Sequence, residues 1–166
     1  MSVAIREMTQ EDWEPVAKIY RQGIQTGNAT FATEVPTYEE WDLSHNKDCR
    51  LVACLNEEVV GWAALSPVSS RCVYGGVAEV SVYVAEDKRG HGIGKTIFTA
   101  LVEESEKNGY WSLRSGVFPE NSASIELHKK CGFRVVGHYE RVGRDSGGKW
   151  RDTSILERRS KTVGID

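Results

Sequence analysis

The chain has 166 residues, 27% of them charged, and a formal net charge of −3 at pH 7. This length predicts one domain over residues 1–166 with a proper hydrophobic core. The weak negative charge argues against a nucleic-acid-binding surface, and the sequence contains neither a membrane-spanning apolar run nor a signal-peptide core. We therefore expect a cytoplasmic protein with no nucleic-acid or membrane partner.

The cysteines do not indicate a metal site or a set of disulfides. They form no Cys-x-x-Cys pair and have no histidines at metal-ligand spacing; they are Cys49, Cys54, Cys72 and Cys131. Such spacing is typical of free thiols in a reducing compartment. We expect no metal.

The first half of the chain predicts a strand, two helices and a hairpin. Alternating and helical apolar periods, with capping residues at the boundaries, place these elements. They are a strand over 3–8, a helix capped by Thr9 that ends near 27–28, a short helix opened by the capping box at 37–40, and hairpin strands over 50–55 and 59–65.

The second half predicts alternating strands and helices. The elements are a strand over 77–84, a long helix up to 107, a strand over 110–117, a helix from Asn121 to Gly132, and strands over 133–139 and 151–157. Because a whole helix separates the strands at 77–84 and 110–117, these two strands should be parallel. The order β-α-α-β-β-β-α-β-α-β-β predicts a mixed sheet with helices on both faces.

A basic, glycine-rich turn joins the strand at 77–84 to the long helix. It contains Gly90, Gly92 and Gly94, flanked by Lys88, Arg89 and Lys95. Unpaired N–H groups and the helix dipole favour negative charge at such a helix start, and glycines let a phosphate approach the backbone. The turn therefore predicts an anion site, and the alternative is a glycine-rich turn without a ligand.

Two common phosphate-binding patterns do not fit this turn. A P-loop would need glycine where Arg89 stands, and a dinucleotide-binding fold would need Gly-x-Gly-x-x-Gly near the chain start. The segment instead reads Arg-x-x-Gly-x-Gly. A second pattern follows over 121–133, Asn-x-x-Ser-x-x-Leu-His-x-x-x-Gly-Phe.

With these two motifs the chain resembles the GNAT acetyltransferases over nearly its whole length. The resemblance implies their acyl-CoA N-acyltransferase fold, an α/β (α+β) fold with a mixed central sheet of about seven strands. Within the family the chain is most similar to the phosphinothricin and methionine sulfoximine N-acetyltransferases. The matching segments are Thr30-Phe31, Arg71 with Tyr74, Ala78-Glu79 and Gly148-Lys-Trp-x-Asp152.

This resemblance implies an enzyme that moves the acetyl group of acetyl-CoA, without a metal, to the α-amino group of a small amino acid or analogue. It also implies a homodimer. The same chemistry on a polyamine, an antibiotic or a peptide N-terminus is an alternative. A non-catalytic acyl-CoA-binding module is another, although such a module has no need for the carboxylate of Glu79.

The candidate catalytic residues are Glu79 and His128. Glu79 is a carboxylate on a largely apolar strand, where it can take a proton from the acceptor amine directly or through a water; the alternative is a salt bridge to a neighbouring arginine. His128 stands where many relatives have a tyrosine general acid, so the resemblance implies that it protonates the departing thiolate. The alternative is a surface or packing histidine.

The resemblance also implies the binding residues. The backbone of Val82, Tyr83 and Val84 would face the pantetheine, because the strand at 77–84 splays from the strand at 110–117 in this family. The pyrophosphate would lie on Arg89, Gly90, His91, Gly92, Ile93, Gly94 and Lys95, with Asn121 near the pantetheine and Lys130 near an adenosine phosphate. The acceptor pocket would involve Phe31, Arg71, Tyr74, Lys149 and Trp150. The alternative for Phe31 is a half-buried loop residue, and for Arg71 a solvated one.

Overall fold

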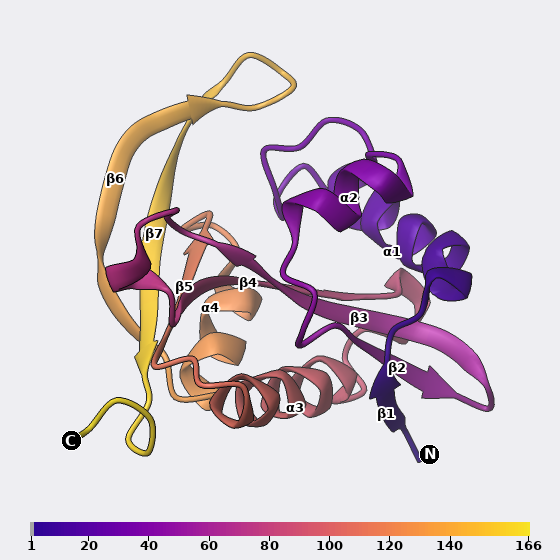
Figure 1. Ribbon diagram of the computed structural model, residues 1–166. Coiled ribbons are helices and arrows are strands. Elements are labelled where there is room, and N and C mark those ends of the chain that lie inside the picture. Colours follow the sequence, from indigo (N-terminus) through magenta and orange to yellow (C-terminus); the bar gives the residue numbers. More distant parts are fainter. Residues whose placement is uncertain (1) are drawn as a thin grey trace.

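The computed structural model describes residues 2–166, in which seven strands form one sheet in the order β1-β2-β3-β4-β5-β7-β6 (Figure 1). Only β4 and β5 are parallel, and all other neighbours are antiparallel. The predicted mixed sheet and its element order are confirmed. The strands are β1 (Ala4–Glu7), β2 (Leu51–Leu55), β3 (Glu58–Pro67), β4 (Val77–Val84), β5 (Ser112–Val117), β6 (Arg134–Arg144) and β7 (Trp150–Arg159).

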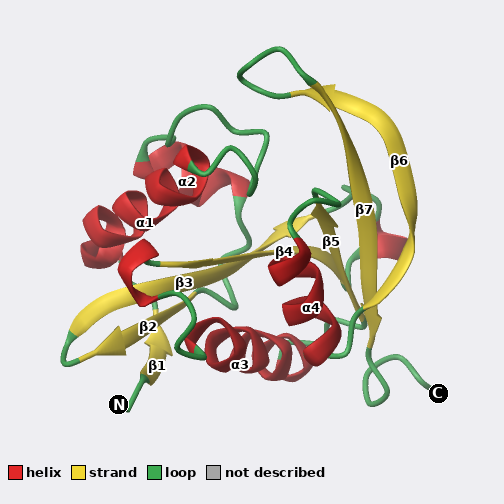
Figure 2. Ribbon diagram, turned by 180° about the vertical axis from the view of Figure 1, so that it is seen from behind, coloured by secondary structure: helices red, strands yellow, loops and turns green. Residues whose placement is uncertain are grey.

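Helices cover both faces of the sheet, as expected (Figures 1 and 2). The helices α1 (Trp13–Gln25) and α2 (Tyr38–Ser44) pack on one face around the fully buried Trp41 and Trp62. The helices α3 (Ile93–Lys107) and α4 (Ser122–Lys130) lie on the other face, and α3 buries Phe98 and Leu101 in the larger core. No helix within residues 2–166 has the length and apolar character to cross a membrane.

The predicted helix boundaries have the expected caps. The Asp12 carboxylate accepts the backbone N–H of Thr9 at 2.8 Å before α1, and Thr37 caps α2 through the N–H of Glu40 at 3.2 Å. Asn121 Oδ1 accepts the N–H of Ser124 at 3.2 Å at the start of α4. These local hydrogen bonds satisfy amides that have no partner within the helix, so the ends are encoded in nearby residues.

The structure differs from the predicted elements mainly in the last hairpin. β6 continues to Arg144 instead of ending at 139, and its pairing with β7 is irregular between Tyr139 and Gly143, where Arg141 has a φ of 45°. The strand is exposed along most of its length, so no alternation of buried and polar residues marks its end. Short 3-10 turns, η1 (Gln10–Asp12), η2 (Cys72–Tyr74) and η3 (Glu86–Lys88), complete the chain.

Candidate active site

β4 and β5 separate in the middle of the sheet. They pair only from Val77–Glu79 to 112–114, although both strands continue further. A cavity of about 800 Å³ opens where they diverge, lined by residues of β4, β5, α4, the glycine turn and the loop after α1. This volume is within the usual range for small-molecule sites, and Glu79 stands at the point of separation. The predicted splay is confirmed.

The splay leaves backbone groups of β4 unpaired on the cavity side. The N–H of Ala85 donates to the carbonyl of Val60 in β3 at 2.8 Å. Because successive residues of a strand direct their N–H and C=O groups to opposite edges, Val82 and Val84 direct theirs away from β3. Both residues line the cavity, and the carbonyl of Val84 accepts a long bond from Arg89 Nε at 3.4 Å.

The glycine turn has the form of an anion-binding helix start. Gly90 and Gly92 have φ values of 82° and 81°, and a Cβ built on either would meet no atom within 4 Å. No side chain of the described residues caps the first turn of α3, and its first helical bond joins the Thr96 N–H to the Gly92 carbonyl at 3.1 Å. The preceding amides therefore remain available to a phosphate, which fits the diphosphate of a coenzyme A.

Most residues of this turn line the cavity, namely Lys88, Arg89, Gly90, Ile93 and Gly94. His91, Gly92 and Lys95 are in the same turn but are not among the lining residues. Lys88 and Arg89 are the cations of the described lining, so the positive charge of the cavity gathers at this end.

Glu79 has no cationic partner. It lies opposite Arg114 in the register of β4 and β5, yet it makes no ion pair with any of residues 2–166. This removes the salt-bridge alternative. The side chain is exposed to the cavity, but the surrounding protein displaces enough water to raise the pKa of Glu79. A carboxyl group with a raised pKa in a cleft is a candidate base.

Aromatic side chains form the wall next to Glu79. The Tyr83 ring stacks on Trp62 with centroids 5.0 Å apart and contacts Tyr20 at 5.1 Å. A Cβ on Gly23 would come within 2.6 Å of Tyr83 Cε1, so glycine is what lets α1 pack closely on β4 here. Phe31 is half-buried and lines the cavity.

His128 lines the cavity and is held in a buried hydrogen-bond network. Its Nδ1 lies 2.6 Å from the carbonyl of Ser124, which can only accept, so Nδ1 carries a proton. Its Nε2 lies 2.8 Å from Ser115 Oγ, and its ring packs edge-on against Phe98 and Phe133. Burial lowers the pKa of His128, so the neutral ring accepts the hydroxyl proton of Ser115 at Nε2. This geometry favours the packing alternative over a general acid.

Asn121 lines the cavity, but both ends of its side chain already have partners. Besides capping α4, it donates from Nδ2 to the carbonyl of Asn28 at 3.1 Å. Arg151 donates to Asn28 Oδ1 at 2.7 Å from the other side. Asn121 thus positions the loop after α1, whose residues 28–31 line the cavity.

Several predicted binding residues lie outside the cavity of this chain. Arg71 is exposed at the start of η2, with its guanidinium 5.7 Å from the Tyr74 ring, and Trp150 is 45% exposed on the last hairpin. The exposed Lys130 and Lys149 also do not line it. The lining residues that the sequence did not indicate include Tyr20, His45, Ser66, Ser115 and Phe118. The helical stripe containing Tyr20 predicted only a core position, and the others carry no motif.

No group of His, Cys, Asp or Glu among the described residues is arranged to hold a metal ion. The four cysteine thiols are free. The features that converge on one site are therefore the split between β4 and β5, the phosphate-fitting turn and an unpaired carboxylate.

Comparison with known proteins agrees with this arrangement. The acetyltransferase (GNAT) family model matches residues 4–133. A phosphinothricin N-acetyltransferase of Streptomyces coelicolor is 34% identical over 94% of this chain and 95% of its own. An L-methionine sulfoximine/L-methionine sulfone acetyltransferase of Pseudomonas paraeruginosa is 27% identical over 95% of this chain and 94% of its own.

A solved structure shows the same fold with the co-substrate. The phosphinothricin acetyltransferase of Sinorhizobium meliloti, in complex with acetyl-CoA, superposes with a TM-score of 0.85 at 26% identity, covering 100% of this chain and 97% of that one. The family match, the cavity and the glycine turn lead to the same conclusion. The chain belongs to the GNAT family and is an acetyl-CoA-dependent N-acetyltransferase.

Proposed function

We propose that the chain acetylates the α-amino group of a small amino acid or analogue of the phosphinothricin and methionine sulfoximine type. The observation that carries this proposal is Glu79, a carboxylate at the point where β4 leaves β5 that has no ion-pair partner within residues 2–166. The relatives named above support the acceptor class.

Glu79 is the proposed general base. A free α-amino group has a pKa of about 8, so near neutral pH most of the acceptor is an ammonium that must lose a proton before it can attack. The raised pKa of Glu79 makes its carboxylate a better proton acceptor than an ordinary glutamate. The proton passes from the ammonium to a carboxylate oxygen of Glu79, directly or through a water.

The backbone of β4 is the proposed binding edge for the acyl donor. Acetyl-CoA supplies the acetyl group as a thioester. The outward N–H groups of Val82 and Val84, which line the cavity, would bind pantetheine and stabilise negative charge on the thioester oxygen. Lys88, Arg89 and the amides after Gly90 would hold the diphosphate.

The thiolate can leave without a dedicated acid. A thiol has a pKa of about 8.5, so its anion is a tolerable leaving group near neutral pH. His128 has no proton at Nε2 in the observed bonding, and burial lowers its pKa. We therefore propose that His128 holds Ser115 and the start of α4 in place, and that it is not the group that protonates the thiolate.

Arg71 is the proposed partner for the carboxylate of the acceptor. It lies in the loop directly before β4, and the cations that line the cavity are at the phosphate end. Because Arg71 lies outside the cavity of a single chain, it reaches the acceptor by movement of η2 or from a second copy. Tyr74, Lys149 and Trp150 are proposed to wall the same mouth.

A homodimer is the proposed assembly. The last hairpin exposes apolar side chains that a monomer leaves in water: Val136 is 51% exposed, Tyr139 57% and Val142 50%. Such a patch is typical of a protein interface. Light scattering coupled to gel filtration tests this, with twice the 18.5 kDa chain mass expected. The free thiols support a cytoplasmic location.

The acceptor class is tested by measuring thiol release from acetyl-CoA with a panel of acceptors. Phosphinothricin, methionine sulfoximine and methionine sulfone should exceed polyamines and peptides by at least about tenfold in kcat/KM, a difference of about 1.4 kcal/mol. A polyamine would need more carboxylates than Glu79, the acidic residue of the described cavity lining. A polyamine or peptide as the best acceptor would overturn the proposal.

A further inference from the structure

A second titratable group faces the acceptor end of the cavity. His45 follows α2 and lines the cavity together with Ser66 and Glu79. Ser66 of β3 lies opposite Glu79 of β4 in the sheet register, so their side chains share one face. The N–H of Asn46 donates to the carbonyl of Leu65 at 2.8 Å, which holds the His45 segment alongside β3.

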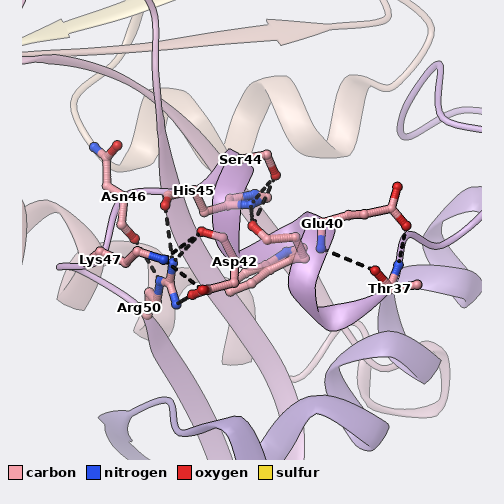
Figure 3. Close-up of polar contacts among 9 residues, drawn as sticks. Thr37, Glu40, Asp42, Ser44, His45, Asn46, Lys47 and Arg50 are labelled. Carbon is pink, nitrogen blue, oxygen red and sulfur yellow. Dashed lines mark hydrogen bonds and ion pairs between the residues drawn. The ribbon is translucent and has the colours of Figure 1, made fainter.

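The tautomer of His45 follows from its hydrogen bonds. Nδ1 lies 2.8 Å from the carbonyl oxygen of Trp41. It also lies 3.0 Å from Ser44 Oγ (Figure 3). A carbonyl only accepts, so Nδ1 carries the proton and Nε2 presents a lone pair. Burial lowers the pKa of His45 despite the bond to Trp41, so the ring stays neutral.

Nε2 of the cavity-lining His45 is accessible. It has no hydrogen-bond partner among residues 2–166, and it is not one of the buried atoms that lack a partner, which are Trp41 Nε1, Trp62 Nε1 and Arg151 Nε. An accessible lone pair on a half-buried, cavity-lining ring is available to a bound molecule.

The ring is held rigidly. It stacks on Trp41 with centroids 4.3 Å apart and an interplanar angle of 19°, and its edge meets Trp62. Arg50 donates to the carbonyls of His45 at 3.1 Å and of Asn46 at 2.7 Å, and to Asp42 Oδ1 at 2.6 Å (Figure 3). A hydrogen-bonding group fixed in this way loses little freedom when it binds a ligand.

We propose that His45 determines acceptor specificity by accepting, at Nε2, a hydrogen bond from an N–H or O–H donor on the acceptor's side chain. The reacting amine lies at Glu79, and the side chain extends along the face of β3 past Ser66 toward His45. This inference rests on the proposed function and deepens it. The acceptors favoured are α-amino acids whose side chain carries a donor a few bonds from the amine.

Methionine sulfoximine and methionine sulfone provide a matched test. They have nearly the same shape, but the sulfoximine carries an N–H where the sulfone carries a second oxygen. The lone pair at His45 Nε2 would accept a hydrogen bond from the N–H of the sulfoximine and would repel the corresponding oxygen of the sulfone. The wild-type kcat/KM should favour the sulfoximine by about two- to tenfold, the range of one neutral hydrogen bond.

His45→Phe keeps an aromatic ring over Trp41 and removes the lone pair. The ratio of kcat/KM for the sulfoximine to kcat/KM for the sulfone should therefore fall to about one. His45→Gln offers a carbonyl oxygen and should recover part of the preference for the sulfoximine. Ser44→Ala is the control, because it removes a contact at Nδ1 and leaves Nε2 unchanged; its preference should equal that of the wild type. Melting temperature and acetyl-CoA affinity should stay near wild type in all three variants.

The outcomes separate the two proposals. If wild-type enzyme transfers acetyl groups to neither amino acid, the proposed function is wrong and this inference falls with it. If both amino acids are acetylated and the wild type does not prefer the sulfoximine, the inference alone is wrong, whether or not His45→Phe folds. If a folded His45→Phe variant loses kcat/KM equally for both acceptors, then His45 contacts a part that the two molecules have in common. That result would also overturn the inference.

Discussion

Replacing Glu79 with glutamine tests the catalytic core of the site most directly. Glutamine has the same shape, and Glu79 has no ion-pair partner among residues 2–166 that the change would strand. The substitution therefore removes the proposed base and little else. General base catalysis is typically worth about 10²–10⁴-fold, or roughly 3–5 kcal/mol of the barrier.

The deficit of Glu79→Gln should depend on pH. With an amine pKa of about 8, only about a tenth of the acceptor is free amine at pH 7, whereas about nine tenths is free at pH 9. The variant should lose at least about a hundredfold in kcat/KM at pH 7. At pH 9 the loss of kcat/KM should be about tenfold smaller than at pH 7, because most of the acceptor amine is then already deprotonated before it binds.

The substitution should not weaken the fold. The pKa of Glu79 is raised in the folded protein, so ionised Glu79 lowers stability at every pH above its ordinary value. Glutamine removes that cost, and the melting temperature near neutral pH should be unchanged or higher. A loss of activity without a loss of stability would thus separate catalysis from folding.

The assay is continuous thiol release from acetyl-CoA with a thiol reagent that works across the whole pH range, at saturating and subsaturating acceptor. Glu86→Gln is the control, since Glu86 follows the same strand in η3 but does not line the cavity. It should behave as wild type. A Glu79→Gln rate within about twofold of wild type between pH 6 and 9 would show that another group or bulk water is the base.

Four further predictions follow from the geometry. Gly92→Val places a branched side chain at a φ of 81° in the glycine turn, so calorimetry should show acetyl-CoA affinity at least about tenfold weaker in a folded protein. Unchanged affinity would contradict diphosphate binding at this turn. Arg71→Ala should lower kcat/KM for amino acids by about 1.5–3 kcal/mol and spare their carboxylamides, whereas equal losses would mean that Arg71 only shapes its loop. His128→Phe should lower the melting temperature and change the rate by less than about threefold, because the ring has no proton to give at Nε2; a hundredfold loss would restore the general acid. Asp12→Asn removes the carboxylate charge and one of the two oxygens that accept 2.8 Å bonds from Arg6. These bonds hold the pKa of Asp12 low, so about 1–2 kcal/mol of unfolding free energy should be lost at pH 7. A lowered pKa stabilises above the ordinary value of about 3.9 and loses its effect as pH falls through the folded value, so the denaturant curves of Asp12→Asn and wild type should merge in acid.

The frame of the site was predictable because its signals are local. The strand at 77–84, the glycine turn and the cap at Asn121 each depend on residues that are neighbours in sequence, and the structure confirms all three. Hydrophobic periodicity, the backbone conformation of glycine and helix-capping preference each depend on a few neighbouring residues. They can therefore be predicted from the sequence without knowledge of the fold.

Part of the cavity wall was not predictable because it is built from distant segments. His45, Ser66 and Tyr20 meet at Glu79 only after α1 and α2 pack on the same face of the sheet. Nothing in the immediate neighbours of His45 indicates that its Nε2 would face a cavity. The hydrogen bond from Asn121 to Asn28 was not predictable for the same reason, because Asn28 lies 93 residues earlier in the chain.

The position of β5 explains why the base and the binding edge occur together. β5 pairs with β7 along its whole length, from Ser112 to Val117, but with β4 only as far as Glu79. Its full pairing with β7 holds it away from β4 without leaving β5 unpaired on both sides. β4 is likewise paired with β3 from Ala78 to Val84, so the split leaves one free edge on each of the two strands. On β4 this edge carries the outward backbone groups of Val82 and Val84, which lack a strand partner among the described residues. The same divergence opens the cavity beside Glu79, so one feature of the sheet accounts for the position of both the proposed binding edge and the proposed base.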